Sequence, residues 1–326
     1  SEQPASCAAM FTANKFCAAP VILDREILKK GKARAVVINS GNANAATGTQ
    51  GIEDAKRVET EAEKLLNLGE DEVFVCSTGV IGQKLPVEKV LDGVRRIVPE
   101  LSKDKGTDAA WAIMTTDTVR KEVAYEMELS GGTVRIGAMA KGSGMIHPNM
   151  ATMLAYITTD AKVDASVLQG MLKKSTDKSF NMMTVDGDTS TNDSLFLLAN
   201  GASGVAIETE EDKAAFAELL DSICMDMALR IASDGEGATH LMVVEAYGLP
   251  TEKDAKLVAR ARRASGRQVH RGLHALQGCR LRPRRQLGPH HGRRRLLRSR
   301  RGSHQGRLHP EERRRRGGGD GKRLRH

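Results

Sequence analysis

Residues 262–326 contain few of the side chains from which a protein core is built. This 65-residue segment contains no Ile, Met, Phe, Trp, Tyr, Thr or Asn, and about a third of it is Arg. It cannot bury enough apolar surface to offset the entropy that ordering would cost. We therefore expect this tail to be disordered and the fold to lie in residues 1–261, a length that suffices for one large or two modest domains.

The charge of the chain divides at the same place. The whole chain has a formal net charge of +9, but residues 262–326 contain 22 Lys and Arg against 3 Asp and Glu. Residues 1–261 contain 28 Lys and Arg against 38 Asp and Glu, so the body is acidic. The overall basicity therefore predicts no anionic partner for the folded part.

Two interpretations of the tail are open. The arginine runs at 293–295 and 313–316 would neutralise phosphates, as in a nucleic-acid-binding arm. Alternatively, a shifted reading frame in a GC-rich gene would give the same excess of Arg, Gly, Pro, His and Leu. We favour the frameshift.

The body carries signs of an intracellular protein. No apolar run is long enough to span a bilayer, and no secretory signal precedes the body, so we expect a cytoplasmic location. The cysteines show no CxxC spacing, which indicates neither a zinc site nor a disulfide framework. We expect reduced and mostly buried thiols at Cys7, Cys17, Cys76, Cys224 and Cys279.

Strands alternate with helices along the body, which predicts an α/β fold. The expected strands are 35–38, 73–76, 133–139, 153–157, 195–198 and 241–245. The expected helices are 52–67, one that opens near Pro86, 164–174, 210–231 and one from Thr251.

Local signals set the limits of these elements. A loop is expected at 39–44 because Asn and Gly follow the first strand. Gly69 is expected to stop the helix at 52–67. The Thr251 hydroxyl is expected to cap the last helix, with Asp254 completing a capping box, and that helix is expected to end near Ala261.

The candidate nucleophile is Thr152, which a glycine-rich loop delivers to the start of an apolar segment. Gly142 and Gly144 allow sharp bends, and Pro148 restricts the approach to Ala151. Attack of the Thr152 hydroxyl on the Ala151 carbonyl would give an ester, and hydrolysis would free Thr152 as a new N-terminus. Its α-amino group, with an ordinary pKa of about 7.7–8.0, would then serve as general base. Taken alone, however, the pattern favours a threonine that merely starts a strand.

Five motifs, taken together, reverse this preference and favour Thr152 as a nucleophile. They are NSGNAN (39–44), CSTGVIG (76–82), MTTDT (114–118), KGSGMIHPNMATML (141–154) and DGEGAT (234–239). Together and in this order they resemble the ornithine acetyltransferase family of arginine biosynthesis, also called glutamate N-acetyltransferase. The resemblance covers residues 5–261.

The resemblance implies a self-processing enzyme. The precursor would cut itself between Ala151 and Thr152, giving an α chain of residues 1–151 and a β chain whose family-like part is 152–261. N-acetylornithine would donate an acetyl group to Thr152, ornithine would leave, and glutamate would accept the acetyl group. No metal or organic cofactor is implied, although some family members also use acetyl-CoA as a co-substrate.

The resemblance also implies an architecture. The fold would be a layered α-β-β-α sandwich with a second, smaller α/β lobe that is truncated or scrambled here. Two α and two β chains would form a heterotetramer, with no nucleic acid or membrane partner. The alternative within the same chemistry is an amidohydrolase or aminopeptidase with an N-terminal threonine.

Individual site residues follow from the same match. Thr78 and Gly79 match the oxyanion hole, where a glycine turn suits the presentation of a hydroxyl and a backbone N–H. Thr118, Lys141 and Glu236 match substrate-binding positions. Lys141 would pair with a substrate carboxylate, and Glu236 with the amino group of ornithine.

Plainer interpretations of these residues stay open. Thr78 and Gly79 also suit an ordinary turn, Lys141 a solvated surface charge, and Glu236 an exposed loop carboxylate. Either neighbouring threonine of the MTTDT motif could replace Thr118. Residues 186–193 lack the terminal Glu of an EF-hand and suit a structural turn near the active site.

The resemblance also provides a test of the frameshift interpretation of the tail. Its members carry the segment Asn-Trp-Gly-Arg-Ile in their C-terminal part, and this chain has none. The codons AAC TGG GGC CGC ATC ATG GC, read from a preceding C, give Gln-Leu-Gly-Pro-His-His-Gly, which is residues 286–292. We therefore hypothesise a frameshift near residue 261, which would remove residues that close the substrate site and leave activity poor or absent.

Overall fold

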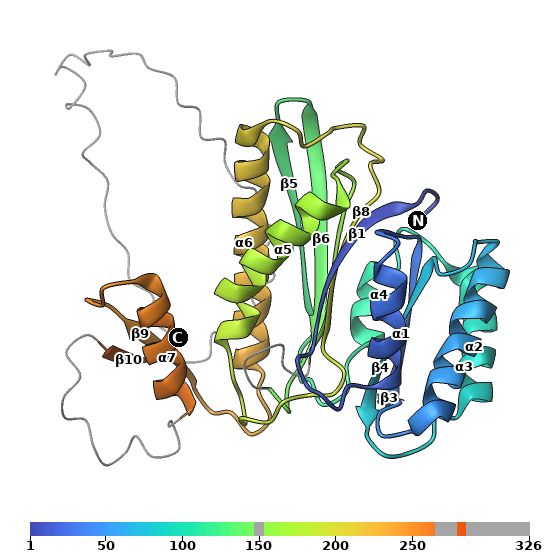
Figure 1. Ribbon diagram of the computed structural model, residues 1–326, viewed down its shortest axis with the longest axis horizontal. Helices are drawn as coiled ribbons and strands as arrows, with labels where there is room; N and C mark the ends of the chain where they lie inside the picture. Colours follow the sequence, from blue (N-terminus) through green and yellow to red (C-terminus); the bar gives the residue numbers. More distant parts are fainter. Residues whose placement is uncertain (147–152, 265–278, 285–326) are drawn as a thin grey trace, which may run out of the picture. The chain divides into compact units, whose positions relative to one another are not determined.

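A computed structural model describes residues 1–146, 153–264 and 279–284, all within the compact unit Ser1–Arg295. Its largest sheet has six strands in the order β2-β1-β8-β7-β6-β5 (Figure 1). These strands are β1 (Ala5–Phe11), β2 (Lys32–Ala33), β5 (Lys121–Leu129), β6 (Gly132–Lys141), β7 (Leu154–Thr159) and β8 (Ser194–Ala199). β7 and β8 are parallel, and all other neighbours in this sheet are antiparallel.

Two smaller sheets complete the described strands. β3 (Ala35–Asn42) and β4 (Val73–Val80) are parallel, and α2 (Gly48–Leu66) connects them. β9 (Leu241–Ala246) pairs antiparallel with β10 (Cys279–Arg284). The other helices are α1 (Ala19–Leu28), α3 (Val87–Ile97), η1 (Val98–Glu100), α4 (Gly106–Ala112), α5 (Ala165–Lys178), η2 (Phe180–Met182), α6 (Glu210–Ser233) and α7 (Glu252–Ala264).

Helices α5 and α6 cover one face of the six-stranded sheet (Figure 1). Leu168 and Leu172 of α5 and Phe216 of α6 are fully buried in a cluster that includes Ile157 of β7. Burying a side chain of this size contributes about 1.5–3 kcal/mol. This cluster therefore fixes the two helices on the sheet.

The other face of that sheet packs against the β3–β4 sheet. The ring of Phe196 on β8 lies 4.6 Å from that of Phe74 on β4, and it stacks on Tyr156 of β7. On its far side, β4 contacts α2 and α3 through Val58 and Leu91. Helices therefore flank a pair of packed sheets, and the expected α/β fold is confirmed.

The parallel strands β3 and β4 run further than expected. β3 continues to Asn42, so the expected loop at 39–44 is wrong for residues 39–42. Gly41 pairs with Gly79, and their φ angles are 103° and 134°. A Cβ on Gly79 would lie 2.3 Å from the Gly41 carbonyl carbon. Glycine here permits a close approach of two strands, which the sequence pattern alone cannot distinguish from a turn.

Helix limits are partly as expected. α2 ends at Leu66, and the next residue, Asn67, has a φ of 52° and is the left-handed C-cap, so Gly69 is not the stop. Pro86 precedes α3 as expected. The Asp254 amide donates to the Thr251 hydroxyl at 3.1 Å, which confirms the cap of α7. That helix runs to Ala264, three residues beyond the expected end, because residues 261–264 are Ala and Arg, which are strong helix formers.

The expectation of a wholly disordered tail is wrong for Cys279–Arg284, which forms β10. Antiparallel pairing with β9 satisfies backbone N–H and C=O groups and needs no apolar side chains. Residues 265–278 and 285–326 lie outside the described residues, so the proposed division at 151 and 261 stays a prediction.

Two further expectations concern cysteines and membranes. Cys7, Cys76 and Cys224 are free and buried, as expected, whereas Cys17 is partly exposed. None of the helices in the described part of the chain has the length and apolarity needed to cross a membrane.

Candidate active site

Five of the residues singled out in the sequence lie at or next to the ends of elements. Thr78 and Gly79 lie near the end of β4, and Lys141 is the last residue of β6. Thr118 precedes β5 and Glu236 follows α6. Ala151 and Thr152 lie outside the described residues.

Lys141 is a buried cation. The residue is 2% exposed, and its Nζ donates to Thr115 Oγ1 at 2.7 Å and to Thr78 Oγ1 at 3.3 Å. Burial lowers the pKa of Lys141, although the negative charge of Asp117 opposes this shift. The interpretation of Lys141 as a solvated surface charge is therefore wrong. An ammonium group at this position contacts a predicted oxyanion-hole residue 63 positions away in the sequence.

The contact with Lys141 orients the Thr78 hydroxyl. A hydroxyl has one proton to donate, and an ammonium group can only donate. Because Lys141 Nζ donates to Thr78 Oγ1, the Thr78 proton must point to another acceptor. A hydroxyl held in this way is suited to donate to an oxygen on which negative charge develops.

A buried ion cluster of Asp117, Lys121 and Asp234 lies beside these residues. Lys121 Nζ donates to Asp117 Oδ1 at 2.7 Å and to Asp234 Oδ2 at 2.6 Å. The Lys121 side chain is fully buried, and both carboxylates are at most 5% exposed. Although burial tends to raise it, the pKa of Asp117 is held below its ordinary value by the charge of Lys121 and the Gly142 N–H. The cluster thus keeps a carboxylate ionised inside the protein.

The buried ion cluster connects the predicted site residues. Asp117 Oδ1 also accepts from the Gly142 amide at 2.7 Å, and Asp117 Oδ2 lies 3.8 Å from Lys141 Nζ. The Asp234 backbone oxygen accepts from the Ser143 hydroxyl at 2.8 Å. The cluster therefore fixes the start of the glycine-rich loop relative to β5 and to the end of α6.

Thr118 and Glu236 have different surroundings. The Thr118 hydroxyl and amide both donate to the Asp234 carboxylate, so this side chain is already engaged, whereas Thr115 contacts Lys141. Glu236 is exposed, and a Cβ on Gly144 would lie 2.9 Å from its carboxyl carbon. Glu236 therefore lies against the glycine-rich loop. Substrate contacts by these residues stay predictions.

Residues 186–193 hold the glycine-rich loop on both sides of residues 147–152. Asp186 Oδ1 accepts from the Ile146 amide at 2.9 Å, and its Oδ2 accepts from Met145. Downstream, Asp193 Oδ1 accepts from the Met153 amide at 3.1 Å. The sequence suggested only a turn here. The carboxylates that bind the loop backbone were missed because their partners lie 40 residues away.

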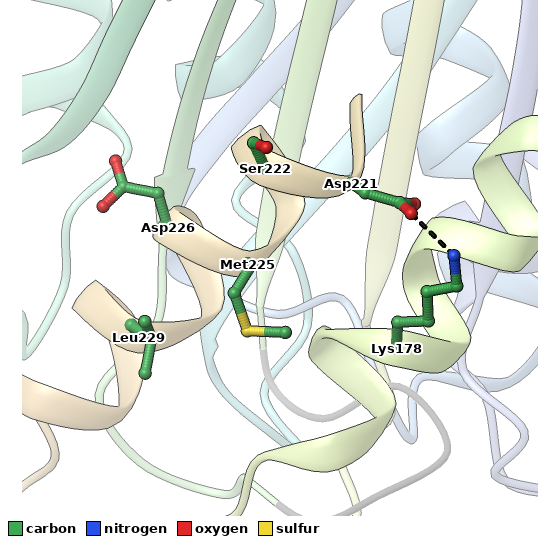
Figure 2. A pocket seen from close by; sticks show the side chains of 6 residues that line it. All are labelled: Lys178, Asp221, Ser222, Met225, Asp226 and Leu229. Atoms are coloured by element: carbon green, nitrogen blue, oxygen red, sulfur yellow. Dashed lines mark hydrogen bonds and ion pairs between the residues drawn. The ribbon is translucent and has the colours of Figure 1, made fainter. Parts of the chain in front are cut away.

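A depression of about 470 Å³ on the surface of α5 and α6 is unrelated to this chemistry (Figure 2). Lys178 and Asp221 form an ion pair of 2.7 Å across it. Its lining consists of Lys178, Asp221, Ser222, Met225, Asp226 and Leu229. None of the predicted site residues that the structure describes lies in this lining.

Comparison with known proteins gives a family. The sequence model of a protein family described as "ArgJ family" matches residues 1–266, which are most of the chain. The chain belongs to the ArgJ family. The match ends close to the residue at which the composition changes.

Two relatives represent the ArgJ similarity. The arginine biosynthesis bifunctional protein ArgJ of Symbiobacterium thermophilum is 50% identical over 263 residues, which are 80% of this chain and 65% of that protein. The glutamate N-acetyltransferase of Methanocaldococcus jannaschii is 48% identical over 265 residues, again 80% and 65%. The matched part of this chain thus spans slightly less than two thirds of the length of these relatives.

A solved structure is also similar. The ornithine acetyltransferase of Mycobacterium tuberculosis, determined in complex with ornithine, is 42% identical. The similarity covers 44% of this chain and 76% of that one, with a TM-score of 0.41.

Proposed function

We propose that this ArgJ-family chain is a self-processing acetyltransferase that moves an acetyl group from N-acetylornithine to glutamate. The observation that carries the proposal is the contact between Lys141 Nζ and Thr78 Oγ1, which joins two of the predicted site residues in a buried setting. Family membership supports the same chemistry.

In the proposed reaction, the chain first cuts itself between Ala151 and Thr152. The freed α-amino group of Thr152 then acts as base for the Thr152 hydroxyl, which attacks the acetyl carbonyl of N-acetylornithine. Thr78 and the Gly79 N–H stabilise the negative oxygen that forms. Ornithine leaves, and glutamate takes the acetyl group from Thr152 in the second half of the cycle.

Charge complementarity assigns the substrate groups. Lys141 attracts the α-carboxylate that both amino acids carry, and Glu236 attracts the side-chain amino group of ornithine. We further propose the family's α-β-β-α sandwich, a heterotetramer of two α and two β chains, and a cytoplasmic location. The reaction as written needs no metal or organic cofactor, and acetyl-CoA is an alternative donor.

Self-cleavage is tested by a denaturing gel and mass spectrometry of the purified protein. We expect a fragment that begins at Thr152, together with its partner ending at Ala151. Thr152→Ala should stay whole, whereas Thr152→Ser, which keeps a hydroxyl, should be cut. An uncut wild-type chain would remove the basis of the proposal.

Acetyl transfer is tested separately. The purified protein, and a chain whose reading frame is restored near residue 261, are supplied with N-acetylornithine in the presence and absence of glutamate, and N-acetylglutamate and free acetate are measured. Glutamate-dependent N-acetylglutamate supports the transferase, whereas acetate release that does not depend on glutamate indicates the alternative, an amidohydrolase.

A further inference from the structure

Asp117 is a buried carboxylate that contacts both partners of one hydrogen bond at the proposed site. Lys141 Nζ donates to Thr115 Oγ1 at 2.7 Å, and Asp117 Oδ2 lies 3.8 Å from the same Nζ and accepts from the Thr115 amide at 3.3 Å. Asp117 Oδ1 accepts at 2.7 Å from the amide of Gly142, the residue that follows Lys141. The Asp117 side chain is fully buried. One carboxylate therefore fixes the ammonium group and the backbone on either side of it.

Lys141 depends on this carboxylate for its charge. Burial lowers the pKa of Lys141, and the positive charge of Lys121 adds to this shift. The negative charges of Asp117 and Glu236 oppose it, and Asp117 has the larger effect. Burial raises the pKa of Asp193 well above its ordinary range, which favours a neutral acid that does not compensate Lys141. Asp117 is therefore the carboxylate that keeps Lys141 an ammonium.

The charge of Lys141 decides in which direction the Thr78 hydroxyl donates. An ammonium group has donors only, so the Thr78 proton points away from it. A neutral amine carries a lone pair and accepts protons. The contact of 3.3 Å between Lys141 Nζ and Thr78 Oγ1 would then form in the opposite sense. The proton that is proposed to stabilise the negative oxygen would be occupied by the amine.

We propose that Asp117 is a positioning residue of the oxyanion hole, which acts through Lys141 to direct the Thr78 hydroxyl toward the reacting oxygen. The inference rests on the acetyl transfer proposed above and adds a residue that acts without touching the substrate. The path from Asp117 to Thr78 consists of two contacts of Lys141 Nζ, 3.8 Å to the carboxylate and 3.3 Å to the hydroxyl.

The competing explanation is that Asp117 only supports the fold, through its hydrogen bonds with Gly142 and Lys121. Asp117→Asn separates the two roles, because an amide oxygen still accepts from both groups but carries no charge. In this variant we expect Lys141 to lose its proton at a pH about 1–3 units lower than in wild type, as the loss of an opposite charge at this distance predicts. An unchanged midpoint would overturn the proposal.

The titration is followed by 15N NMR of the whole chain labelled at the lysine Nζ atoms, since an ammonium and an amine differ in chemical shift. The Lys141 signal is the one that is missing in Lys141→Met. Asp221→Asn is the matched control, because Asp221 also forms an ion pair with a lysine, Lys178. That pair lines the depression on α5 and α6 (Figure 2), so its loss should leave the midpoint of Lys141 unchanged.

Acetyl transfer tests the step from Lys141 to Thr78. In the chain whose reading frame is restored near residue 261, Asp117→Asn should lower kcat at least about 10-fold, because a donor to the negative oxygen is misdirected. In a Thr78→Val background the same substitution should lower kcat less than about 2-fold, since no hydroxyl is left to direct. Equal losses in the two backgrounds would overturn the proposal.

The loss of kcat should also depend on pH. As pH falls through the lowered midpoint of Lys141 in Asp117→Asn, the ammonium returns, and the ratio of variant to wild-type kcat should rise. A constant ratio would indicate a defect of the fold and would contradict the proposal. If wild type transfers no acetyl group, the proposed function fails, and the titration still decides whether Asp117 holds the ammonium. If wild type is active and the variant behaves like it, this inference alone fails.

A measurement on the wild type covers the case in which Asp117→Asn does not fold. Despite its burial, Lys141 should give the 15N signal of an ammonium at neutral pH. The signal of an amine would overturn the proposal, because the Thr78 proton would then have an acceptor in Lys141.

Discussion

Lys121 is the residue on which the buried ion cluster depends. It is the cation that lies within hydrogen-bond distance of both the Asp117 and the Asp234 carboxylates, at 2.7 and 2.6 Å. Removing one partner of a buried ion pair leaves a charge without compensation, which costs far more than the pair itself contributes.

We therefore expect Lys121→Met to lower the free energy of unfolding by about 3–5 kcal/mol, as measured by urea denaturation. Lys178→Met is the control. Its ion pair with Asp221 is partly exposed to solvent, and its loss should cost less than about 1 kcal/mol. If the two substitutions lowered the free energy of unfolding equally, the buried ion cluster would not depend on Lys121.

Asp24 makes stability depend on pH. Burial raises the pKa of this carboxyl well above its ordinary range, although its Oδ1 accepts from the Val75 amide at 2.8 Å. In the unfolded chain an Asp ionises near pH 3.9, whereas folded Asp24 stays protonated to higher pH. The stability that its neutral form provides is complete below the unfolded pKa and is lost as pH rises towards the folded one.

Asp24→Asn should remove this pH-dependent contribution to the free energy of unfolding. Its stability relative to wild type should increase with pH above about 4, by up to about 1.4 kcal/mol per pH unit. Unfolding midpoints at several pH values measure the difference. Asp164→Asn should instead lose stability relative to wild type as pH rises to about 4, and the difference should stay constant above it, because hydrogen bonds from Ser166 lower the pKa of Asp164. A pH-independent difference for Asp24→Asn would contradict the expectation.

At the scale of elements, the closest packing lies between β3 and β4. Gly79→Ala should be strongly destabilising, since its Cβ would overlap Gly41 backbone atoms at 2.3–2.6 Å and its φ of 134° disfavours other residues. We expect a loss of more than about 3 kcal/mol in thermal or urea unfolding.

Gly82→Ala is the control, because its φ of 82° carries a similar strain but no atom lies within 4 Å of the added Cβ. This substitution should lower the free energy of unfolding by about 1–2 kcal/mol. If both substitutions cost the same, the close approach of the strands is not what requires Gly79.

The elements that the sequence predicted are those with long apolar or clearly periodic patterns, such as α6 and β8. The missed ones have weak patterns. β1 is dominated by Ala, Ser and Cys, which are not typical strand residues, and β5 alternates charged and apolar residues along a half-buried surface. Their place in the sheet comes from tertiary packing, which overrides local propensity.

The same limit applies to the site. Glycine and threonine motifs marked Thr78 and Lys141, but nothing local indicated that Lys121 would pair with Asp234 across 113 positions. The sequence could identify side chains that are able to take part in the reaction. It could not identify the buried carboxylates that hold them, because those act through contacts between distant segments.

At the scale of the whole molecule, the frameshift hypothesis makes a prediction about activity. The present chain contains the residues proposed for self-cleavage, whereas the family's C-terminal region would be missing. We therefore expect cleavage without efficient acetyl transfer, and transfer in a chain whose reading frame is restored near residue 261. Resequencing of the gene and the acetyl transfer assay test this.

An intact frame, with residues 286–292 found in the protein, would contradict the frameshift. The nucleic-acid-binding interpretation would then be tested by salt-dependent DNA binding that is lost when residues 262–326 are deleted.

The strand order gives the proposed cut an unusual outcome. β7 and β8 follow position 152 in sequence, yet they lie between β1 and β6, which precede it. In the six-stranded sheet, strands of one future fragment thus pair with strands of the other, β8 with β1 and β7 with β6. Breaking the peptide bond would leave two polypeptides that are held together by the backbone hydrogen bonds between these strands. Each pair of α and β chains in the mature protein would then consist of subunits that were never separate molecules, and folding each subunit by itself would not rebuild the shared sheet.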